Sequence, residues 1–221
     1  MDKTILHNIS YGMYVIGACD GNRPVGCIIN TCIQVTSENP IIAVALNKNN
    51  YTFEVIERSK KFCLSIISEE TSPSVITTFG FQSSRDNNKY ETFDYEIKNG
   101  VPVLKGKFAG WLICDVVNIV KNETHHVIFA RLSDTIKGEN THPMTYEYYH
   151  KVIKGKAPKN APTYQSEETV ADAGSEIKAG TVKQQYVCSI CGYVHEGDIA
   201  EEPDDYVCPI CKAAKSYFVP A

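Results

Sequence analysis

Runs of apolar and β-branched residues alternate with short polar turns through the first two thirds of the chain. The runs at 11–18 and 62–67 have the length of strands, and the run IIAVAL at 41–46 is apolar on both faces, as a buried strand is. The tripeptide Asp20-Gly21-Asn22 after the first run is a typical turn signal. Further strands are predicted at 26–37, 111–120 and 125–132.

Only two short helices are predicted among these strands, at 51–60 and 72–79. Asn50 or Thr52 can cap the first of them, since both side chains accept a hydrogen bond from a backbone N–H of a first helical turn. Many strands with few helices favour a mainly β fold. We therefore expect a closed or split β-barrel rather than a doubly wound sheet.

Composition changes sharply after residue 163. Residues 164–184 are polar, rich in small side chains and nearly free of aromatic residues, which predicts a flexible linker. The unit that follows, 185–221, is too short to bury a self-sufficient core. The predicted organisation is thus a barrel domain at 1–163, a linker at 164–184 and a small domain at 185–221.

The small domain carries two C-x-x-C pairs, Cys188/Cys191 and Cys208/Cys211. Four thiolates at this spacing predict tetrahedral coordination of one metal ion, and metal binding should stabilise so small a unit. The spacing leaves two metals open, because zinc in a structural ribbon and iron in a redox centre both use it. An aromatic shell is available from Tyr186, Tyr193, Tyr206 and Phe218.

The formal charge of −4 is unevenly distributed. Residues 1–183 are neutral, whereas 184–221 hold six acids and two lysines. This balance argues against a nucleic-acid binder and leaves two interpretations of the acidic surface: solvation, or steering toward a basic partner. No run of about 18 apolar residues occurs that would span a membrane. The first residues, MDKTILHNIS, do not resemble a secretory signal, so we expect a cytoplasmic protein.

Two polar loops of the barrel domain have the chemistry to bind a nucleotide. Residues 45–56 place a strand end and polar side chains at a helix N-terminus, which attracts phosphate. The loop FQSSRDNNKY at 81–90 adds an arginine and a lysine. Each loop alone is typical of an ordinary turn, but both together, beside a strand holding Asn30 and Thr31, predict a pocket for a phosphate and a ring. No dinucleotide-binding glycine motif or P-loop is present.

The segments YGMYVIGACDG, INTCIQVTSENP, ALNKNNYTFEVI, FGFQSSRDNNKY and NGVPVLKG resemble the flavin reductase family, which has an FMN-binding split barrel. The resemblance implies a homodimer with the flavins near the subunit interface. It also implies that His125, in Glu123-Thr124-His125, takes the place of the histidine of the family's G-D-H motif and contacts nicotinamide or flavin; the alternative is a packing or surface histidine. It places the FMN contacts at Asn30, Thr31, Cys32, Lys48, Asn49, Thr52, Ser84, Arg85 and Lys89.

The small domain resembles rubredoxin, the mononuclear Fe(Cys)4 electron carrier, in its Y-V-C-x-x-C-G-Y and Y-V-C-P-x-C segments. The short gap 192–207 and Lys212 after the last cysteine resemble the abbreviated domain of rubrerythrins. With YYHKVIKGKAPKNAPTY between the domains, the chain is similar to the fused subgroup of high-molecular-weight rubredoxins. That similarity implies an NADH-oxidising donor to flavodiiron proteins of anaerobes.

The predicted electron path runs from NADH or NADPH to FMN, to Fe(Cys)4 and then to a flavodiiron-type O2 or NO reductase. A hydride carries two electrons and a single iron accepts one, so a flavin is the natural converter. Two other interpretations remain. One is a flavin or ferric reductase with a structural zinc ribbon, and the other is a non-enzymatic flavin- or metal-binding adaptor.

Overall fold

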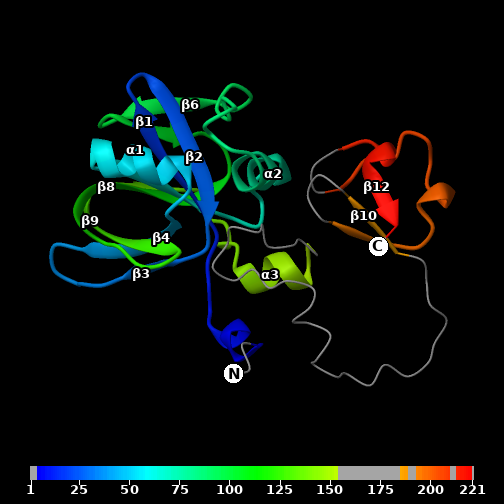
Figure 1. The fold of residues 1–221 in the computed structure, drawn as a ribbon, viewed down its shortest axis with the longest axis horizontal. Helices are drawn as coiled ribbons and strands as arrows, with labels where there is room; N and C mark the ends of the chain where they lie inside the picture. Colours follow the sequence, from blue (N-terminus) through cyan, green and yellow to red (C-terminus); the bar gives the residue numbers. More distant parts are fainter. Residues whose placement is uncertain (1–3, 154–184, 189–192, 210–212, 221) are drawn as a thin grey trace.

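A computed structural model describes residues 4–153, 185–188, 193–209 and 213–220 (Figure 1). The barrel domain is built on a seven-stranded antiparallel sheet of order β2-β1-β5-β8-β9-β4-β3. Its main elements are β1 (Tyr14–Asp20), β2 (Arg23–Ile29), β3 (Cys32–Gln34), β4 (Ile41–Asn47), α1 (Tyr51–Ser59), β5 (Lys61–Ile67), α2 (Pro73–Phe81), β6 (Tyr95–Lys98), β7 (Val101–Leu104), β8 (Phe108–Val120), β9 (His125–Lys137) and α3 (Tyr146–Lys151).

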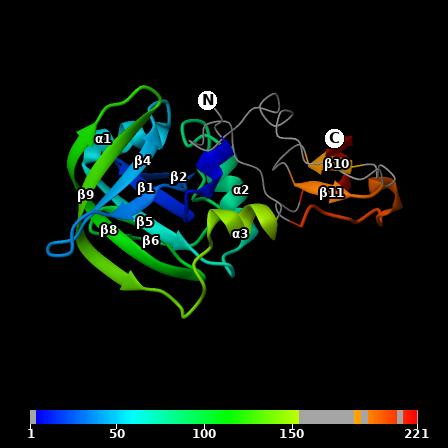
Figure 2. The same ribbon diagram turned by 90° about the horizontal axis from the view of Figure 1, so that it is seen from below.

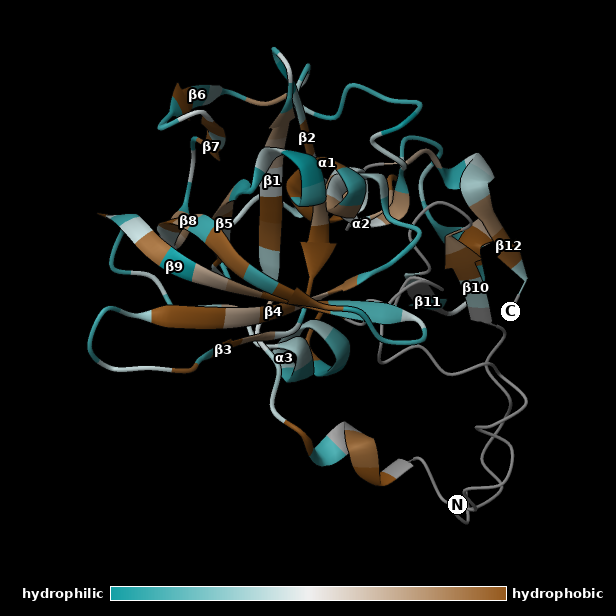
Figure 3. Cartoon of the chain, turned by 60° about the vertical axis from the view of Figure 1, so that its left-hand side comes forward, coloured by the Kyte–Doolittle hydropathy of each residue, from teal (hydrophilic) through white to brown (hydrophobic). Residues whose placement is uncertain are grey.

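The sheet separates two apolar cores. Alternation along β5 sends Phe62 and Leu64 into the core beneath α1, whereas Cys63 and Ile67 enter the core that α2 and the β6–β7 hairpin close. Strands β1 and β2 are hydrophobic and buried over most of their length (Figure 3), because α1 packs against both strands and α2 and β7 also pack against them. The predicted mainly β, split-barrel architecture is therefore confirmed.

The long strands β8 and β9 curl across the sheet, as the view from below shows (Figure 2). Their pairing slips between Ile113 and Cys114 and again between Val116 and Asn118. Such bulges increase local twist and let a long sheet bend. Gly138 follows β9 where a β-carbon would lie 2.1 Å from the Phe108 carbonyl oxygen, so this close approach requires glycine.

Two elements differ from the sequence prediction. The expected strand at 26–37 is interrupted at Asn30, which is buried and accepts a hydrogen bond from the Thr31 hydroxyl at 3.1 Å; β2 and β3 lie on opposite ends of the sheet. A third helix, α3, is also present, so the prediction of only two helices is wrong. The Thr145 hydroxyl caps α3 by accepting from the Tyr148 N–H at 3.1 Å.

The small domain contains a three-stranded sheet of order β11-β10-β12. Its elements are β10 (Gln185–Cys188), β11 (Val194–Glu196), the 3-10 turns Ile199–Glu201 and Lys215–Tyr217, and β12 (Phe218–Pro220). Cys188, Ile199, Cys208 and Phe218 form its core. The predicted linker at 164–184 lies outside the described residues. Among the helices that the structure describes, none is long and apolar enough to cross a bilayer.

Candidate functional site

The turn between β4 and α1 gathers polar groups at a helix N-terminus. Asn50 is the N-cap, and its side-chain oxygen accepts from the Thr52 N–H at 2.9 Å, as the sequence predicts for one of its two capping candidates. Lys48 and Asn49 are exposed beside it, and the Asn49 N–H donates to the Asn47 side chain at 3.0 Å. The exposed turn therefore combines a positive side chain with the positive end of the α1 dipole, which suits an anion.

Thr52 lies behind this turn rather than on it. The residue is fully buried, and no hydrogen bond to its hydroxyl is found among the described residues. Burial raises the pKa of the Cys27 thiol, and the nearby Thr52 hydroxyl and Asn50 side chain offset part of that rise. In this structure Thr52 thus faces the protein interior, and a direct flavin contact for its hydroxyl stays a prediction.

The loop after α2 is fixed to β2 by a set of buried hydrogen bonds. The Ser84 hydroxyl accepts from the Gly26 N–H at 3.1 Å and donates to the Gly26 carbonyl at 2.8 Å. The Lys89 ammonium donates to the carbonyls of Gly26, at 2.9 Å, and of Phe79, at 3.1 Å. Lys89 is 2% exposed, and burial lowers the pKa of its amine to about 8. Both side chains brace the loop, and their assignment to the FMN phosphate remains untested.

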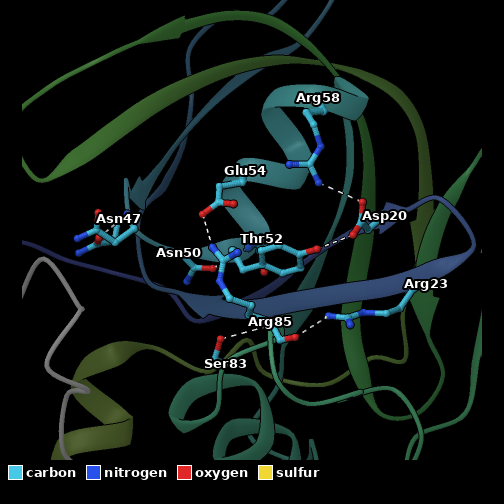
Figure 4. Close-up of polar contacts among 11 residues, drawn as sticks. Asp20, Arg23, Asn47, Asn50, Thr52, Glu54, Arg58, Ser83 and Arg85 are labelled. Carbon is cyan, nitrogen blue, oxygen red and sulfur yellow. Dashed lines mark hydrogen bonds and ion pairs between the residues drawn. The ribbon is translucent and has the colours of Figure 1, made fainter.

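Charged side chains gather around the N-terminus of α1 (Figure 4), where Arg23 and Arg85 lie over the ring of Tyr51, the first residue of the helix. The guanidinium carbon of Arg85 lies 4.5 Å from the ring centroid, and that of Arg23 lies 5.6 Å from it. Arg85 also pairs with Glu54 in the first turn of α1. The half-exposed Arg85 is thereby held over the N-terminus of α1, beside the exposed turn of Lys48 and Asn49.

The other side of the cluster anchors Tyr51 itself. Its hydroxyl donates to the Asp20 carboxylate at 2.5 Å, and Arg58 pairs with the same carboxylate at 3.0 Å. The Tyr51 hydrogen bond, followed by that of Arg58, holds the pKa of Asp20 below its ordinary value. Arg23 completes the frame by donating to the Ser84 and Arg85 carbonyls. Sequence reasoning missed these supporting residues, and the one signal for them was an aromatic residue directly after the N-cap.

The two adjacent histidines at the start of β9 have different environments. His126 is 9% exposed, its ring centroid lies 4.8 Å from that of Phe53, and its Nδ1 accepts from the Asn122 N–H at 3.2 Å, so it is a packing residue. His125 pairs across the sheet with Asn47, next to the exposed turn of Lys48 and Asn49. The Lys48 N–H donates to the Thr124 carbonyl at 3.0 Å, which ties the two segments together. Of the two, only His125 lies where a ligand at this turn would be in reach.

Cys32 begins β3 and pairs with Val44 on β4, the strand that leads to the same turn. Burial raises the pKa of its thiol to about 11. The thiol is therefore protonated near neutral pH, which argues against a thiolate nucleophile and favours Cys32 as a neutral side chain of the sheet. Asn30 and Thr31 precede it in the connection between β2 and β3.

The small domain repeats one backbone arrangement around its two cysteine pairs. The Cys188 N–H donates to the Tyr193 carbonyl at 2.9 Å, and the Cys208 N–H donates to the Ala213 carbonyl at 2.8 Å. Just outside each of these bonds, Val187 pairs with Val194 and Val207 pairs with Ala214. In both segments the first cysteine is thus hydrogen-bonded to the fifth residue after it, as expected where two knuckles hold one ion.

The chemistry of these knuckles fits a thiolate-bound metal. Cys188 and Cys208 are fully buried, and the rings of Tyr193 and Tyr206 lie 6.3 and 5.7 Å from that of Phe218, which confirms the aromatic shell. Cys191 and Cys211 lie outside the described residues, and within the part of the chain that the structure describes no group of three or more metal-ligating side chains is found. The four-cysteine ligand set therefore remains a prediction, which the matching backbone hydrogen bonds of Cys188 and Cys208 support.

Residues 6–155 match the flavin reductase like domain family, and residues 186–219 match the rubrerythrin, rubredoxin-like domain family. The chain belongs to the flavin reductase-like family. This membership, with the rubredoxin-like domain, makes the chain a flavoprotein oxidoreductase of electron transport that contains iron.

Two relatives cover the flavin reductase-like domain in different contexts. The high molecular weight rubredoxin of Moorella thermoacetica is 35% identical, with 99% of each chain aligned. The ferric-chelate reductase (NAD(P)H) of Archaeoglobus fulgidus is 33% identical over 74% of this chain and 98% of its own. Almost the whole of the second relative therefore aligns with about three quarters of the present chain.

Solved structures confirm the fold. A putative oxidoreductase from Sinorhizobium meliloti superposes with a TM-score of 0.58 at 21% identity, covering 64% of this chain and 48% of that one. The flavoredoxin of Methanosarcina acetivorans gives a TM-score of 0.55 at 18% identity, covering 59% and 70%. At this identity the likeness concerns the split barrel of the flavin reductase-like domain alone.

Proposed function

We propose that the chain oxidises NADH or NADPH with FMN and passes the electrons singly to an Fe(Cys)4 centre in its small domain. The observation that carries the proposal is the presence of both units in one chain, with alignment over 99% of a high molecular weight rubredoxin. A flavin, when bound, supplies the conversion of a two-electron hydride into single electrons. The balanced reaction is one NADH and two ferric centres giving NAD+, one proton and two ferrous centres.

The residues around the N-terminus of α1 would hold the FMN phosphate. Arg85 and Lys48 offer positive charge, and the first turn of α1 offers its dipole. Arg23, Ser84 and Lys89 would fix the loop that carries Arg85, since their hydrogen bonds are made to main-chain groups of that loop or of β2. His125 would lie at the edge of the ring, and Cys32 would form part of its neutral surroundings.

The small domain would act as the one-electron carrier. Cys188, Cys191, Cys208 and Cys211 would ligate the iron, and the aromatic shell around Cys188 and Cys208 would exclude water from it. Exclusion of water lowers the local dielectric constant and, with hydrogen bonds to sulfur, sets the reduction potential. We propose a flavodiiron-type O2 or NO reductase as the acceptor, as the resemblance to high-molecular-weight rubredoxins implies.

A homodimer is part of the proposal, and the outer face of the sheet supports it. Cross-strand pairs place Ile33, Ala43 and Phe129 in one row, on the face opposite the core residues Val44 and Ile128. Ile33 is 63% exposed in one subunit. An apolar sheet face of this kind marks an interaction surface, and a second copy of the chain would cover it.

A flavin or ferric reductase with a structural zinc site is the second candidate. It is favoured by the ferric-chelate reductase of Archaeoglobus fulgidus, of which 98% aligns with only 74% of this chain. A visible spectrum and a metal analysis of the purified protein separate the candidates. Flavin bands with red Fe(Cys)4 absorption, both bleached by NADH, support the first, and flavin with zinc supports the second. A colourless zinc protein would contradict both and favour a non-enzymatic adaptor.

A further inference from the structure

Two apolar side chains of the barrel domain pack against the core of the metal domain. Phe81 ends α2, and Ile153 follows α3; both contact the barrel core that contains Phe79 and Tyr149. Both also contact the core of the small domain, which consists of Cys188, Ile199, Cys208 and Phe218. We call Phe81 and Ile153 the seat. Figures 1 and 2, viewed from perpendicular directions, both show the small domain beside the ends of α2 and α3.

The seat meets the part of the small domain that holds the metal ligands. Two of the four residues in the contacted core are the predicted ligands Cys188 and Cys208. Thiolate sulfur is the shortest exit for an electron from an Fe(Cys)4 centre, because it is bonded directly to the iron. A domain seated in this way therefore turns the core that contains Cys188 and Cys208, rather than a remote surface, toward the barrel.

The seat is also continuous with the proposed flavin site. Phe81 is followed directly by the loop that carries Ser84 and Arg85. The four residue-to-residue steps from Phe81 to Arg85 span at most about 14 Å. Arg85 in turn lies over Tyr51 at the N-terminus of α1. A short stretch of chain thus connects the contact with the metal domain to the proposed phosphate site.

The contact is apolar, and the acidic residues of the small domain lie elsewhere. The acidic face, as we call it, consists of Glu201, Glu202, Asp204 and Asp205. Three of these carboxylates are exposed, and Glu202 lies within 3.5 Å of His195 in its own domain. Among the ion pairs that the structure describes, each joins two residues of the barrel or two of the small domain. The acidic face is therefore left exposed when the cysteine core is seated.

We propose that the seat is the intramolecular docking site at which the metal domain of the same chain receives electrons from the flavin. This inference rests on the proposed function and adds the place of transfer to it. With both groups bound, one electron would pass from the reduced flavin to Fe(III), giving Fe(II). The second electron of the hydride would follow once the external acceptor had reoxidised the iron, and the proton of the overall reaction would be released to solvent. The acidic face remains available to an external acceptor.

The test is an anaerobic stopped-flow experiment on the full-length holoprotein with NADH, following the flavin and iron bands separately. The first variant, Ile153→Asp, introduces a carboxylate into the apolar contact. Its matched control is Val152→Asp, with the same charge change at an adjacent residue that is 60% exposed and belongs to neither core. We expect flavin reduction at the wild-type rate in both, and iron reduction slowed about tenfold or more in Ile153→Asp alone; tenfold corresponds to about 1.4 kcal/mol of lost docking.

A second pair keeps the test decisive if Ile153→Asp does not fold. Phe81→Leu shortens one side chain of the seat, and Phe93→Leu makes the same change at a phenylalanine that packs on the barrel core but not on the small domain. Slower iron reduction is expected for Phe81→Leu only, with no dependence on salt. Unchanged iron reduction in the folded seat variants would overturn the docking site while leaving the proposed function intact. Failure of NADH to reduce the wild-type flavin would instead contradict the proposed function.

Discussion

Arg85 offers the sharpest prediction about the flavin site. The side chain pairs with Glu54 and lies 4.5 Å above the Tyr51 ring, and it is 53% exposed. An exposed ion pair contributes about 0–1 kcal/mol and an exposed cation–π contact about 0.5–1 kcal/mol. Replacing Arg85 with alanine should therefore lower the free energy of unfolding by no more than about 2 kcal/mol.

The effect on FMN affinity should be larger and specific to the phosphate. A hydrogen bond to a charged group contributes about 1.5–3 kcal/mol, so Arg85→Ala should weaken FMN binding by about 10- to 150-fold. Riboflavin has the same ring without the phosphate, and its affinity should not change. Arg58→Ala is the matched control, because Arg58 is also an exposed α1-region arginine paired with an acid, Asp20.

The assay is titration of the apoprotein with FMN and with riboflavin, followed by flavin fluorescence, together with thermal unfolding without ligand. We expect Arg85→Ala to lose FMN affinity selectively, while Arg58→Ala binds FMN as the wild type does. Equal weakening of FMN and riboflavin would refute the phosphate assignment, since it would indicate a general disturbance of the pocket. Unchanged FMN affinity in Arg85→Ala would refute any contact.

Four further predictions concern other parts of the molecule. His125→Ala should slow flavin reduction by NADH at unchanged stability, whereas His126→Ala should lower the melting temperature; the opposite pattern would reverse their roles. Because burial lowers the pKa of Lys89 to about 8, the wild type should gain stability relative to Lys89→Met as pH rises from 8 to the ordinary lysine value of 10.5, by up to about 3 kcal/mol in urea unfolding; a flat difference would show that the pKa of Lys89 in the folded protein equals its value in the unfolded chain. Neutralising the acidic face should slow reduction of an external acceptor at low salt but leave internal iron reduction unchanged, and an acceptor rate insensitive to salt would exclude steering. Ile33→Lys should convert the proposed dimer to a monomer in sedimentation, and a persistent dimer would place the interface elsewhere.

Local signals explain which elements the sequence predicts well. Helix α1 begins where Asn50 offers a side-chain cap, and the turn after β1 contains Gly21 at a φ of +60°. The spacing of the cysteines predicts two knuckles, because a C-x-x-C segment must curl for both sulfurs to reach one ion, and the matching backbone hydrogen bonds of Cys188 and Cys208 support them. In these cases the residues that determine the structure are close together in the chain.

The features that were missed depend on tertiary contacts or on competing propensities. The alternating, β-branched pattern of residues 26–37 predicts one continuous strand. In the structure β2 ends at Ile29, before the buried Asn30, whose side chain accepts a local hydrogen bond from Thr31. Helix α3 is rich in tyrosine, which favours strands, and its helical signals were confined to the Thr145 cap, Glu147 in the first turn and Lys151 in the last. Arg23 lies 61 residues from Ser84, so no local pattern indicates that Arg23 braces the loop after α2.

The interior orientation of Ser84 and Lys89 has the same origin. In the sequence both belong to a polar loop, and a polar loop beside a helix suggests phosphate binding. Their hydrogen bonds to Gly26 exist because the fold brings β2 against that loop, where Tyr90 fills the space left by Gly17 and Gly26. A β-carbon at Gly17 would lie 2.3 Å from the Tyr90 hydroxyl, so this packing depends on residues far from the loop in sequence.

An anaerobic titration with NADH, followed by the visible spectrum, tests the proposed electron path most directly. Each subunit should accept two electrons at the flavin and one at the iron, so complete bleaching should require about 1.5 NADH per subunit. The flavin and iron bands should both disappear in a single preparation without added mediator. Bleaching of the flavin alone, complete at about 1.0 NADH per subunit with the iron band unchanged or absent, would contradict the account.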